Sequence, residues 1–512
     1  MDPRDFLGHN GLPYSEAQKL LRRVVDVGLR FKYRKPFGAP PSREALDLIA
    51  TEPLPLEGQP VDELLTALAD NYLPHMPNFA STAFAGFPDA GNSVAGTAGA
   101  LLAELLNVNM INAEFCSRGA TEMEIALIRW LRELIGYTIA PTAPMSATDV
   151  GGIPTAGGTN ANFAAVLLAR TRASADVRQK GLGRWNQRQR VILPEHVGHY
   201  TVGASLAWSG LGTDAALYSP VKDFRYDLPR LHDTLSAAQE RGDEVIMAVT
   251  YAGDSRTMTI DELGEVAATV RQYYPEAWLH CDGCHGTSLL FSSSQRSRLD
   301  GLSEYDSVMM DPHKVLTVPY SNSFLLLRDP ADAAMISTES ELILRQARSF
   351  GQVTPATGSR AFHSLRTWML LKSLGVQGVG SMIDRRIDAA RRFAEIIDES
   401  PYLIRLNDVS INSVMFTLDP VNNGAPFGAE AAEVSARATE KAYQAILHDG
   451  AAYLHSFLIA DTGDRLGLGR SYRHPVLRFM SGNPLIQDVD MFDLVEQCVD
   501  LAKLHRTLSH TQ

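Results

Sequence analysis

The sequence predicts an α/β protein that has a mainly parallel sheet in its larger part and a smaller α+β lobe after it. From about residue 150 to residue 330, short β-rich runs alternate with helical patterns, an order that produces parallel strands joined by right-handed crossovers. Hydrophobic residues make up 45% of the 512 residues and charged residues 21%, which supplies enough apolar side chains for a sizeable core. A disordered chain is therefore excluded.

Each predicted element has its own signal. Residues 1 to about 60 carry basic amphipathic segments and many prolines, so we expect an arm that packs against another surface. Helices are predicted over 160–170, 227–241 and 259–273; Thr159 and Asn160 would cap the first, and Thr259-Ile-Asp-Glu262 has the form of a capping box for the third. The C-terminal lobe opens with an Arg- and Ala-rich helix over 383–400. The predicted strands are 190–194, 215–218, 245–250, 277–281, 307–310 and 323–327.

Charge and hydropathy exclude several classes of partner. The chain has 47 Lys and Arg against 59 Asp and Glu, a net charge of −12, and no basic run, which argues against nucleic acid or an anionic membrane surface. No apolar run reaches the ~18 residues of a spanning helix. The first residues, Met1-Asp2-Pro3-Arg4-Asp5, lack the pattern of a signal peptide. The expected location is the cytoplasm.

The four cysteines exclude a disulfide scaffold for a chain of this length. Two of them stand in His280-Cys-Asp-Gly-Cys-His285, which contains the CxxCH pattern of haem attachment and also resembles a zinc site. Because this segment ends a predicted strand, Cys281 and Asp282 should point to opposite faces of the sheet. We therefore expect no metal here, and we interpret Cys281 and Cys284 as packing residues around a functional Asp282.

Functional side chains should follow the predicted strands, because ligands of parallel sheets bind beyond the carboxyl ends of the strands. Those positions carry His196 and His199, Gly253-Asp254-Ser255, Asp282 and Asp311-Pro-His-Lys314. The segment Thr155-Ala-Gly-Gly-Thr-Asn-Ala-Asn162 also runs directly into a predicted helix. One edge of the sheet is thus predicted to collect most of the polar chemistry of the chain.

These residues fit the parts of one ligand. Gly157, Gly158 and Thr159 at a helix start suit a phosphate. Lys314, with its pKa lowered by burial, suits attack on a carbonyl, and Asp282 suits a pyridinium proton. Taken alone, each has a plainer interpretation: a tight turn, a surface lysine, a turn aspartate and, for His199, a structural histidine. Together they indicate pyridoxal 5′-phosphate.

With these motifs in place, the chain resembles the group II pyridoxal-phosphate-dependent amino-acid decarboxylases, which include glutamate, aromatic amino-acid and tyrosine decarboxylases. The resemblance runs from about Phe84 to Asp490. It is carried by Gly86–Ser93 with Ala120–Glu124, by the Thr155–Asn162 loop, by Asp282, by Asp311–Lys314 and by Arg478–Pro484.

The resemblance implies the aspartate-aminotransferase-like type I fold with a seven-stranded sheet. It also implies a homodimer with the active site at the interface. The implied organisation is an N-terminal arm and interface segment (1–110), a large cofactor-binding domain (111–371) and a small C-terminal domain (372–512).

The resemblance also implies roles for single residues. Lys314 would form the internal aldimine, Asp282 would pair with the pyridinium nitrogen, and His199 would stack on the ring. Gly158 and Thr159 would hold the phosphate beside His313, and Ser255 would lie near the ring oxygen. Ser359 would reach the phosphate of the partner subunit's cofactor, and Phe87 would line the pocket across the interface together with Asp89. The implied reaction breaks the bond between Cα and the carboxylate through a quinonoid intermediate.

One departure from the family pattern bears on the product. The family's decarboxylases protonate Cα with a tyrosine on a loop that corresponds to Arg328–Gly358, and this chain has no tyrosine between Tyr320 and Tyr402. Loss of that tyrosine resembles the family's aldehyde-forming enzymes, which suggests decarboxylation-dependent oxidative deamination. Alternatives are another acid, such as His363 or a partner histidine, and elimination of a β-substituent.

Two further residues bear on the substrate. Asp254 stands where the family often has a hydroxyl residue. Arg118 is suited to bind a second carboxylate bidentately, although a structural ion pair is the plainer interpretation. A non-catalytic binding protein on the same fold would tend to lose Lys314 or Asp282, and both are present. The substrate is therefore expected to be an L-amino acid or an amino-acid conjugate. The sequence does not specify the side chain of this substrate.

Overall fold

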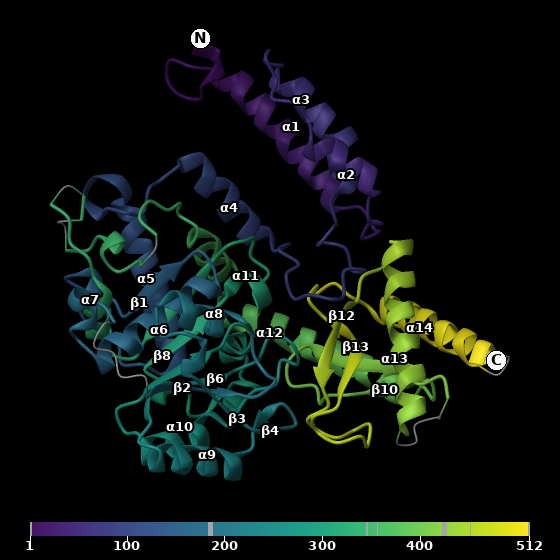
Figure 1. Ribbon diagram of the computed structural model, residues 1–512. Helices are drawn as coiled ribbons and strands as arrows, with labels where there is room; N and C mark the ends of the chain where they lie inside the picture. The colour runs from purple at the N-terminus through teal and green to yellow at the C-terminus, as the bar shows by residue number, and fades with distance from the viewer. Residues whose placement is uncertain are drawn as a thin grey trace.

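The computed structural model (Figure 1) describes residues 3–182, 188–341, 343–344, 347–355, 357–421, 427–450 and 452–509. The helices are α1 (Tyr14–Lys32), α2 (Arg43–Ala50), α3 (Val61–Ala67), α4 (Val94–Leu106), α5 (Gly119–Ile135), α6 (Gly158–Ala173), α7 (Val177–Lys180), α8 (Thr201–Trp208), α9 (Leu228–Glu240), α10 (Leu263–Tyr273), α11 (Pro312–Val315), α12 (Leu365–Asp398), α13 (Ala429–Asp449) and α14 (Asp488–Ser509). Short 3₁₀ and π-helical turns lie between them.

The strands are β1 (Gly152–Thr155), β2 (Gln189–Pro194), β3 (Ala216–Ser219), β4 (Val221–Lys222), β5 (Arg225–Tyr226), β6 (Glu244–Tyr251), β7 (Trp278–Asp282), β8 (Ser307–Met310), β9 (Ser323–Leu327), β10 (Leu403–Arg405), β11 (Ser413–Leu418), β12 (His455–Ala460) and β13 (Arg473–Met480). All six strands predicted from the sequence are present, each within one residue at either end. The strand β1 was not predicted.

A seven-stranded sheet in the order β1-β9-β8-β7-β6-β2-β3 forms the centre of the large domain. Strands β2, β3, β6, β7 and β8 pair in parallel, and β9 runs antiparallel to both of its neighbours. The α/β fold class and the mainly parallel sheet are thus confirmed. Strand β9 departs from the parallel rhythm because the chain between β8 and β9 contains only the four-residue helix α11, too short for a crossover back along the sheet.

The strands of this sheet are buried almost throughout, as expected when helices cover both faces. Helix α6 contacts β1, β6, β7, β8 and β9, whereas α9 and α10 contact β6 and each other. One continuous apolar core joins these helices to the sheet. This core fixes the carboxyl ends of β2, β6, β7 and β8 side by side.

The C-terminal lobe has its own antiparallel sheet, ordered β10-β11-β13-β12, against which α12, α13 and α14 pack (Figure 1). Its core is a separate cluster in which the rings of Phe393 and Phe479 stack with centroids 3.8 Å apart. The long helix α12 crosses the predicted domain boundary at 371/372. It contains one non-helical residue, Gly375 (φ 63°, ψ 177°), so the change of direction lies close to that boundary.

The two predicted helix caps are wrong. Helix α10 begins at Leu263 after Glu262, and no side chain caps it. Thr259 lies upstream of that helix start, where its hydroxyl bonds that of Thr257 (2.8 Å). Helix α6 begins at Gly158 with Gly157 before it, again without a side-chain cap, so Thr159 lies inside the first turn. At neither start does a side chain form a capping hydrogen bond.

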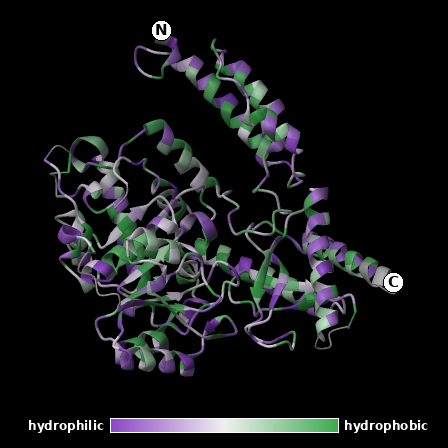
Figure 2. Cartoon of the chain, viewed as in Figure 1, coloured by the Kyte–Doolittle hydropathy of each residue, from purple (hydrophilic) through white to green (hydrophobic). Residues whose placement is uncertain are grey.

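The first three helices form an arm that projects from the body of the molecule (Figure 1). None of the residues of α1, α2 or α3 is buried, although hydrophobic residues occur all along these helices (Figure 2). In the described part of the chain, no helix is both long enough and apolar enough to cross a membrane.

Arg386 of α12 joins three distant segments. Its buried guanidinium donates hydrogen bonds to the carbonyl oxygens of Pro88 (3.1 Å) and Ser481 (3.1 Å), and also to those of Val315 and Gly482. It therefore ties the loop before α4 and the C-terminal lobe to helix α11.

Replacing Arg386 should destabilise the whole fold. We expect Arg386→Leu to lower the free energy of unfolding by roughly 3 kcal/mol, because several buried carbonyl groups would lose their donor. Urea unfolding of the cofactor-free protein, followed by circular dichroism, measures this change. The adjacent, exposed Arg385 provides the matched control, Arg385→Leu. Equal midpoints for the two variants would contradict the assignment.

Candidate active site

A cavity of about 310 Å³ opens at the carboxyl edge of the large sheet. It brings together seven of the residues predicted from the sequence: Gly158, Thr159, His199, Ser255, Asp282, His313 and Lys314. They come from α6, from the loops after β2 and β6, from the end of β7 and from α11. Seven residues that the sequence analysis singled out, from segments far apart in the chain, thus line the same cavity.

The Gly-rich turn between β1 and α6 forms the floor of the cavity. A Cβ atom at Gly158 would lie 2.7 Å from Oδ2 of Asp311 and 3.0 Å from the Met309 side chain. Only glycine allows this approach. The turn leads directly into a helix of 16 residues, whose first N–H groups and positive dipole end favour an anion such as a phosphate.

Asp282 is held by hydrogen bonds on both carboxylate oxygens. Its side chain is 2% exposed. Oδ2 accepts from Nδ2 of Asn162 (2.9 Å), and Oδ1 accepts from the backbone N–H of Cys284 (3.2 Å). Asp282 is thus held in a fixed orientation in the wall of the cavity.

Asn162 is itself oriented by a buried chain of side chains. The indole N–H of Trp278 donates to Oγ of Ser307 (2.7 Å), which lies 2.8 Å from Nδ1 of His280. Nε2 of His280 lies 2.9 Å from Oδ1 of Asn162. If the Ser307 hydroxyl donates to Nδ1, then Nε2 carries the hydrogen and Asn162 must turn its amide N–H toward Asp282. Burial lowers the pKa of His280 to about 4, so this histidine stays neutral.

Lys314 lies among negative groups. Its Nζ is 3.0 Å from Oδ2 of Asp311. Burial lowers the pKa of Lys314, but Cys284, Asp311, Asp282 and Asp89 act in the opposite direction, and the pKa is well above its ordinary value. The prediction that burial would lower this pKa is wrong for the protein without cofactor, because the surrounding carboxylates outweigh the loss of water.

His199 lies in the loop between β2 and α8, and it lines both this cavity and a neighbouring one. Burial and the positive charge of Lys314 lower the pKa of His199, so its imidazole is neutral at neutral pH. Its ring centroid is 4.2 Å from that of Tyr200. A neutral, partly buried ring at this place is suited to stack on a flat ligand.

Four predicted residues lie outside the lining of this cavity. Ser359 is exposed and accepts a hydrogen bond from Asn109 (2.9 Å). Arg118 is exposed and donates from Nε to the carbonyl of Glu114 (3.1 Å). Phe87 belongs to an aromatic cluster, with its ring 4.7 Å from that of His455. Asp89 is buried close to Lys314. The interface roles predicted for Ser359 and Phe87, and the binding of a second carboxylate predicted for Arg118, stay predictions.

The cysteine motif packs as an internal structure. Cys281 is buried and Sγ of Cys284 lies 3.0 Å from Nδ1 of His285. Burial raises the pKa of both thiols. Within the described ranges, no three His, Cys, Asp or Glu side chains are grouped as metal ligands would be.

Three further residues, Asn162, Asp311 and Tyr320, line the cavity. In the sequence, Asn162 and Asp311 fall within the motifs quoted above but were assigned no role, and Tyr320 was not singled out. Asn162 had a usable signal, since it falls one turn after Gly158 on the same helix. Asp311 and Tyr320 had only their nearness to Lys314 in the chain. His363, considered as an alternative acid, does not line the cavity; its Nε2 lies 4.0 Å from Oε1 of Glu104.

Removing the Asn162 amide should weaken cofactor binding. A hydrogen bond to a charged group contributes about 1.5–3 kcal/mol, so we expect Asn162→Ala to raise the dissociation constant for pyridoxal 5′-phosphate by roughly 10- to 100-fold. Absorbance titration of the cofactor-free protein measures this constant. Asn160→Ala, on the same helix but outside the cavity, is the control. An unchanged constant for Asn162→Ala would remove Asn162 from the site.

Comparison with known proteins places this geometry in context. The chain is 28% identical to an L-2,4-diaminobutyrate decarboxylase of Acinetobacter baumannii over 316 residues, which are 58% of this chain and 60% of that protein. It is 24% identical to the phenylacetaldehyde synthase of Petunia hybrida over 361 residues, which are 69% of this chain and 69% of that protein. The aligned part therefore spans about three fifths of the diaminobutyrate enzyme.

Solved structures show the same fold. Mouse CSAD in its apo form covers 96% of this chain and 100% of its own, with a TM-score of 0.84 at 20% identity. Oryza sativa TDC with PLP and tryptamine covers 96% and 98%, with a TM-score of 0.83 at 21% identity.

A family model described as the pyridoxal-dependent decarboxylase conserved domain matches residues 45–419. The matched range includes every residue of the cavity lining. The predicted family, the type I fold and the cofactor are confirmed by these findings. The chain belongs to the family of pyridoxal-dependent decarboxylases.

Proposed function

We propose that the protein is a pyridoxal 5′-phosphate-dependent decarboxylase that removes the α-carboxylate of an L-amino acid or amino-acid conjugate. One observation carries the proposal: Lys314, Asp282 and the start of α6 line a single cavity. An amine, a fixed carboxylate and an anion-binding helix start match the aldehyde, the ring nitrogen and the phosphate of the cofactor. When bound, the cofactor supplies an electron sink for the carbanion formed at Cα.

The residues of the cavity divide this work. Gly158 and Thr159 hold the phosphate at the start of α6, while His313, whose Nδ1 lies 2.9 Å from the carbonyl of Asn322, borders the same space. Asp282, oriented by the hydrogen bond from Asn162, would pair with the protonated ring nitrogen. His199 stacks on the ring and orients the substrate carboxylate. Ser255 lies near the ring oxygen.

Lys314 attaches the cofactor through its amine. Before attachment the ammonium group is held by Asp311, and only the neutral amine attacks a carbonyl. Because the pKa of Lys314 is raised, the neutral fraction is small at neutral pH and grows as the pH rises toward that pKa.

A second product class has an observation in its favour. The segment 328–358 has no tyrosine, and one relative is named a phenylacetaldehyde synthase. In the oxidative branch, one amino acid, one dioxygen and one water give one aldehyde, one carbon dioxide, one ammonia and one hydrogen peroxide. In the simple branch, the amino acid gives only the amine and carbon dioxide. Oxygen uptake during turnover distinguishes the branches.

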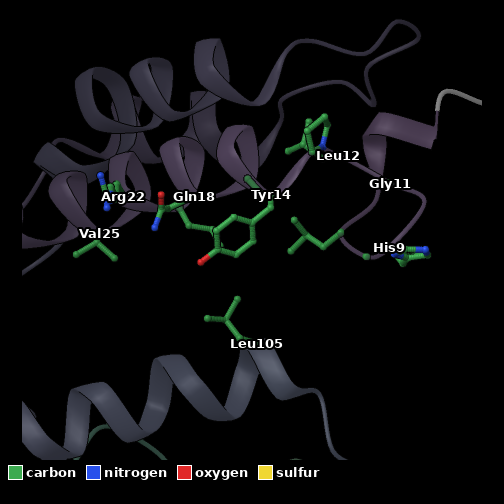
Figure 3. A pocket seen from close by; sticks show the side chains of 13 residues that line it. His9, Gly11, Leu12, Tyr14, Gln18, Arg22, Val25 and Leu105 are labelled. Atoms are coloured by element: carbon green, nitrogen blue, oxygen red, sulfur yellow. The ribbon is translucent and has the colours of Figure 1, made fainter.

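We also propose that two copies of the chain associate through the arm and α4. A groove of about 820 Å³ lies between the N-terminal segment, α1 and α4 (Figure 3), where Tyr14 and Val25 of the arm face Leu105. Leu101, Leu105 and Leu106 are 46%, 56% and 52% exposed. A second copy would cover these apolar faces and would bring partner residues toward Ser359 and Phe87. The cytoplasmic location stays a prediction.

Replacing the lysine should abolish turnover and the bound chromophore together. We expect that the Lys314→Ala protein releases no carbon dioxide with any L-amino acid. We also expect it to lack the absorbance band that borohydride bleaches in the wild-type holoenzyme. Lys222→Ala, which changes a surface lysine of β4, should keep both. Carbon dioxide release by Lys314→Ala, or a wild-type protein that binds no cofactor, would overturn the enzymatic proposal.

A charge on the exposed face of α4 should separate the two copies. We expect Leu105→Glu to shift the protein from dimer to monomer in sedimentation velocity, because the substitution places an unpaired charge in an apolar interface. Val489→Glu, at an exposed position of α14, should leave the dimer intact. A Leu105→Glu protein that still sediments as a dimer would refute this interface.

A further inference from the structure

Tyr320 and Asp89 form a polar pair at the cavity that the proposed function leaves without a role. Tyr320 is the one tyrosine among the described residues that line the cavity, where it borders the same space as Lys314, His199 and Asp282. Its side chain is 50% exposed. Its ring packs against that of His313, with centroids 4.9 Å apart and planes at 42°. The phenol is thus fixed from one side and open toward the ligand space.

Asp89 lies behind Tyr320, in the loop before α4. It is 7% exposed, and its Oδ1 has no hydrogen-bond partner among the described side chains and backbone groups. The Tyr320 side chain lies close enough to this carboxyl for each group to shift the pKa of the other. Burial raises the pKa of Asp89, although the Tyr320 hydroxyl and the charges of Lys314 and His313 oppose the shift. Asp89 therefore holds a proton more readily than an exposed aspartate does.

The chemistry at Cα needs one proton at this point. When the carboxylate leaves as carbon dioxide, its bonding electron pair stays at Cα. An amine forms if an acid closes a C–H bond there, and an aldehyde forms if dioxygen removes the electrons first. A phenol at the cavity wall can supply the proton: its O–H bond breaks and the C–H bond forms. A neighbouring carboxyl then returns a proton to the phenolate oxygen and takes a new proton from solvent water.

We propose that Tyr320, supported by Asp89, is the acid that protonates Cα, so that the product is an amine although the loop tyrosine is absent. The inference rests on the decarboxylation proposed above. Burial and the neighbouring Asp89 raise the pKa of Tyr320, which keeps the phenol protonated until a strongly basic carbon is formed beside it.

The test measures all products of the holoenzyme with a panel of L-amino acids. Proton transfer by a positioned acid contributes ~100-fold or more. We therefore expect Tyr320→Phe to form amine at least ~100-fold more slowly, while carbon dioxide release continues with oxygen uptake and aldehyde. Asp89→Asn should change the product ratio in the same direction but less. Tyr218→Phe, which changes an exposed tyrosine of the neighbouring cavity, should leave the ratio unchanged.

A second readout does not depend on turnover. The dissociation constant for pyridoxal 5′-phosphate should be the same for wild type and Tyr320→Phe, since the phenol acts on the substrate carbon. In the cofactor-free protein, the Asp89→Asn substitution should lower the pH at which Tyr320 ionises, because the carboxylate that raises the pKa of this phenol is gone. The pH titration of phenolate absorbance measures this ionisation, and the same titration of Tyr320→Phe identifies the part of the signal that comes from Tyr320.

The outcomes separate the two proposals. A wild-type holoenzyme that releases no carbon dioxide overturns the decarboxylase proposal. Three outcomes overturn only the role of Tyr320. The wild type could release carbon dioxide but form aldehyde, the Tyr320→Phe protein could keep its full amine yield, or the Tyr320→Phe protein could lose affinity for the cofactor.

Discussion

The hydrogen bond from Asn162 to Asp282 joins the two parts of the active site. Asn162 belongs to α6, whose first turn forms the anion-binding floor, and Asp282 ends β7. The bond therefore fixes the position of the Asp282 carboxylate relative to the start of α6. It also depends on the buried sequence of Trp278, Ser307 and His280. The geometry of the site is fixed by groups deep in the sheet, and the loops around the cavity add the residues that contact substrate.

The same site also has a particular charge arrangement around Lys314. Lys314 is the positive group among Asp311, Asp282 and Asp89. Each of these carboxylates raises the pKa of Lys314 and so favours the ammonium form of the lysine. A cofactor bound to this amine would take the place of the free ammonium group beside Asp311. The site in its free form is thus organised to hold an ammonium ion, and the cofactor has to replace that charge with its own.

The sequence predicted the large sheet well because its strands are continuous apolar runs and their ends carry the polar residues. It failed where local patterns compete with packing. Strand β1 is only four residues long and contains Gly152 and Pro154, so no periodicity marks it. The capping signal at Thr259 was overridden by a turn built from its own hydroxyl contacts.

In the site, the residues that follow strands were found, because parallel strands end at one edge. Residues that act through neighbours were not. Asp89 was named as a substrate residue only through resemblance, and that role stays a prediction. Its proximity to Tyr320 joins loops more than 200 residues apart in the chain. No spacing rule connects such a pair. The raised pKa of Lys314 was missed for the same reason: its cause is the three-dimensional arrangement of carboxylates from several segments.

The contacts of Arg386 have a consequence for how the molecule is made. This residue bonds segments that precede it by 298 residues and follow it by 96, and one of its acceptors is the carbonyl of Val315, next to Lys314. Arg386 therefore gains its full set of acceptors only after Gly482 has been synthesised. Contacts of such long sequence separation slow folding. Its bond to Val315 involves only residues made earlier, so Arg386 can support α11 before the C-terminal lobe is complete.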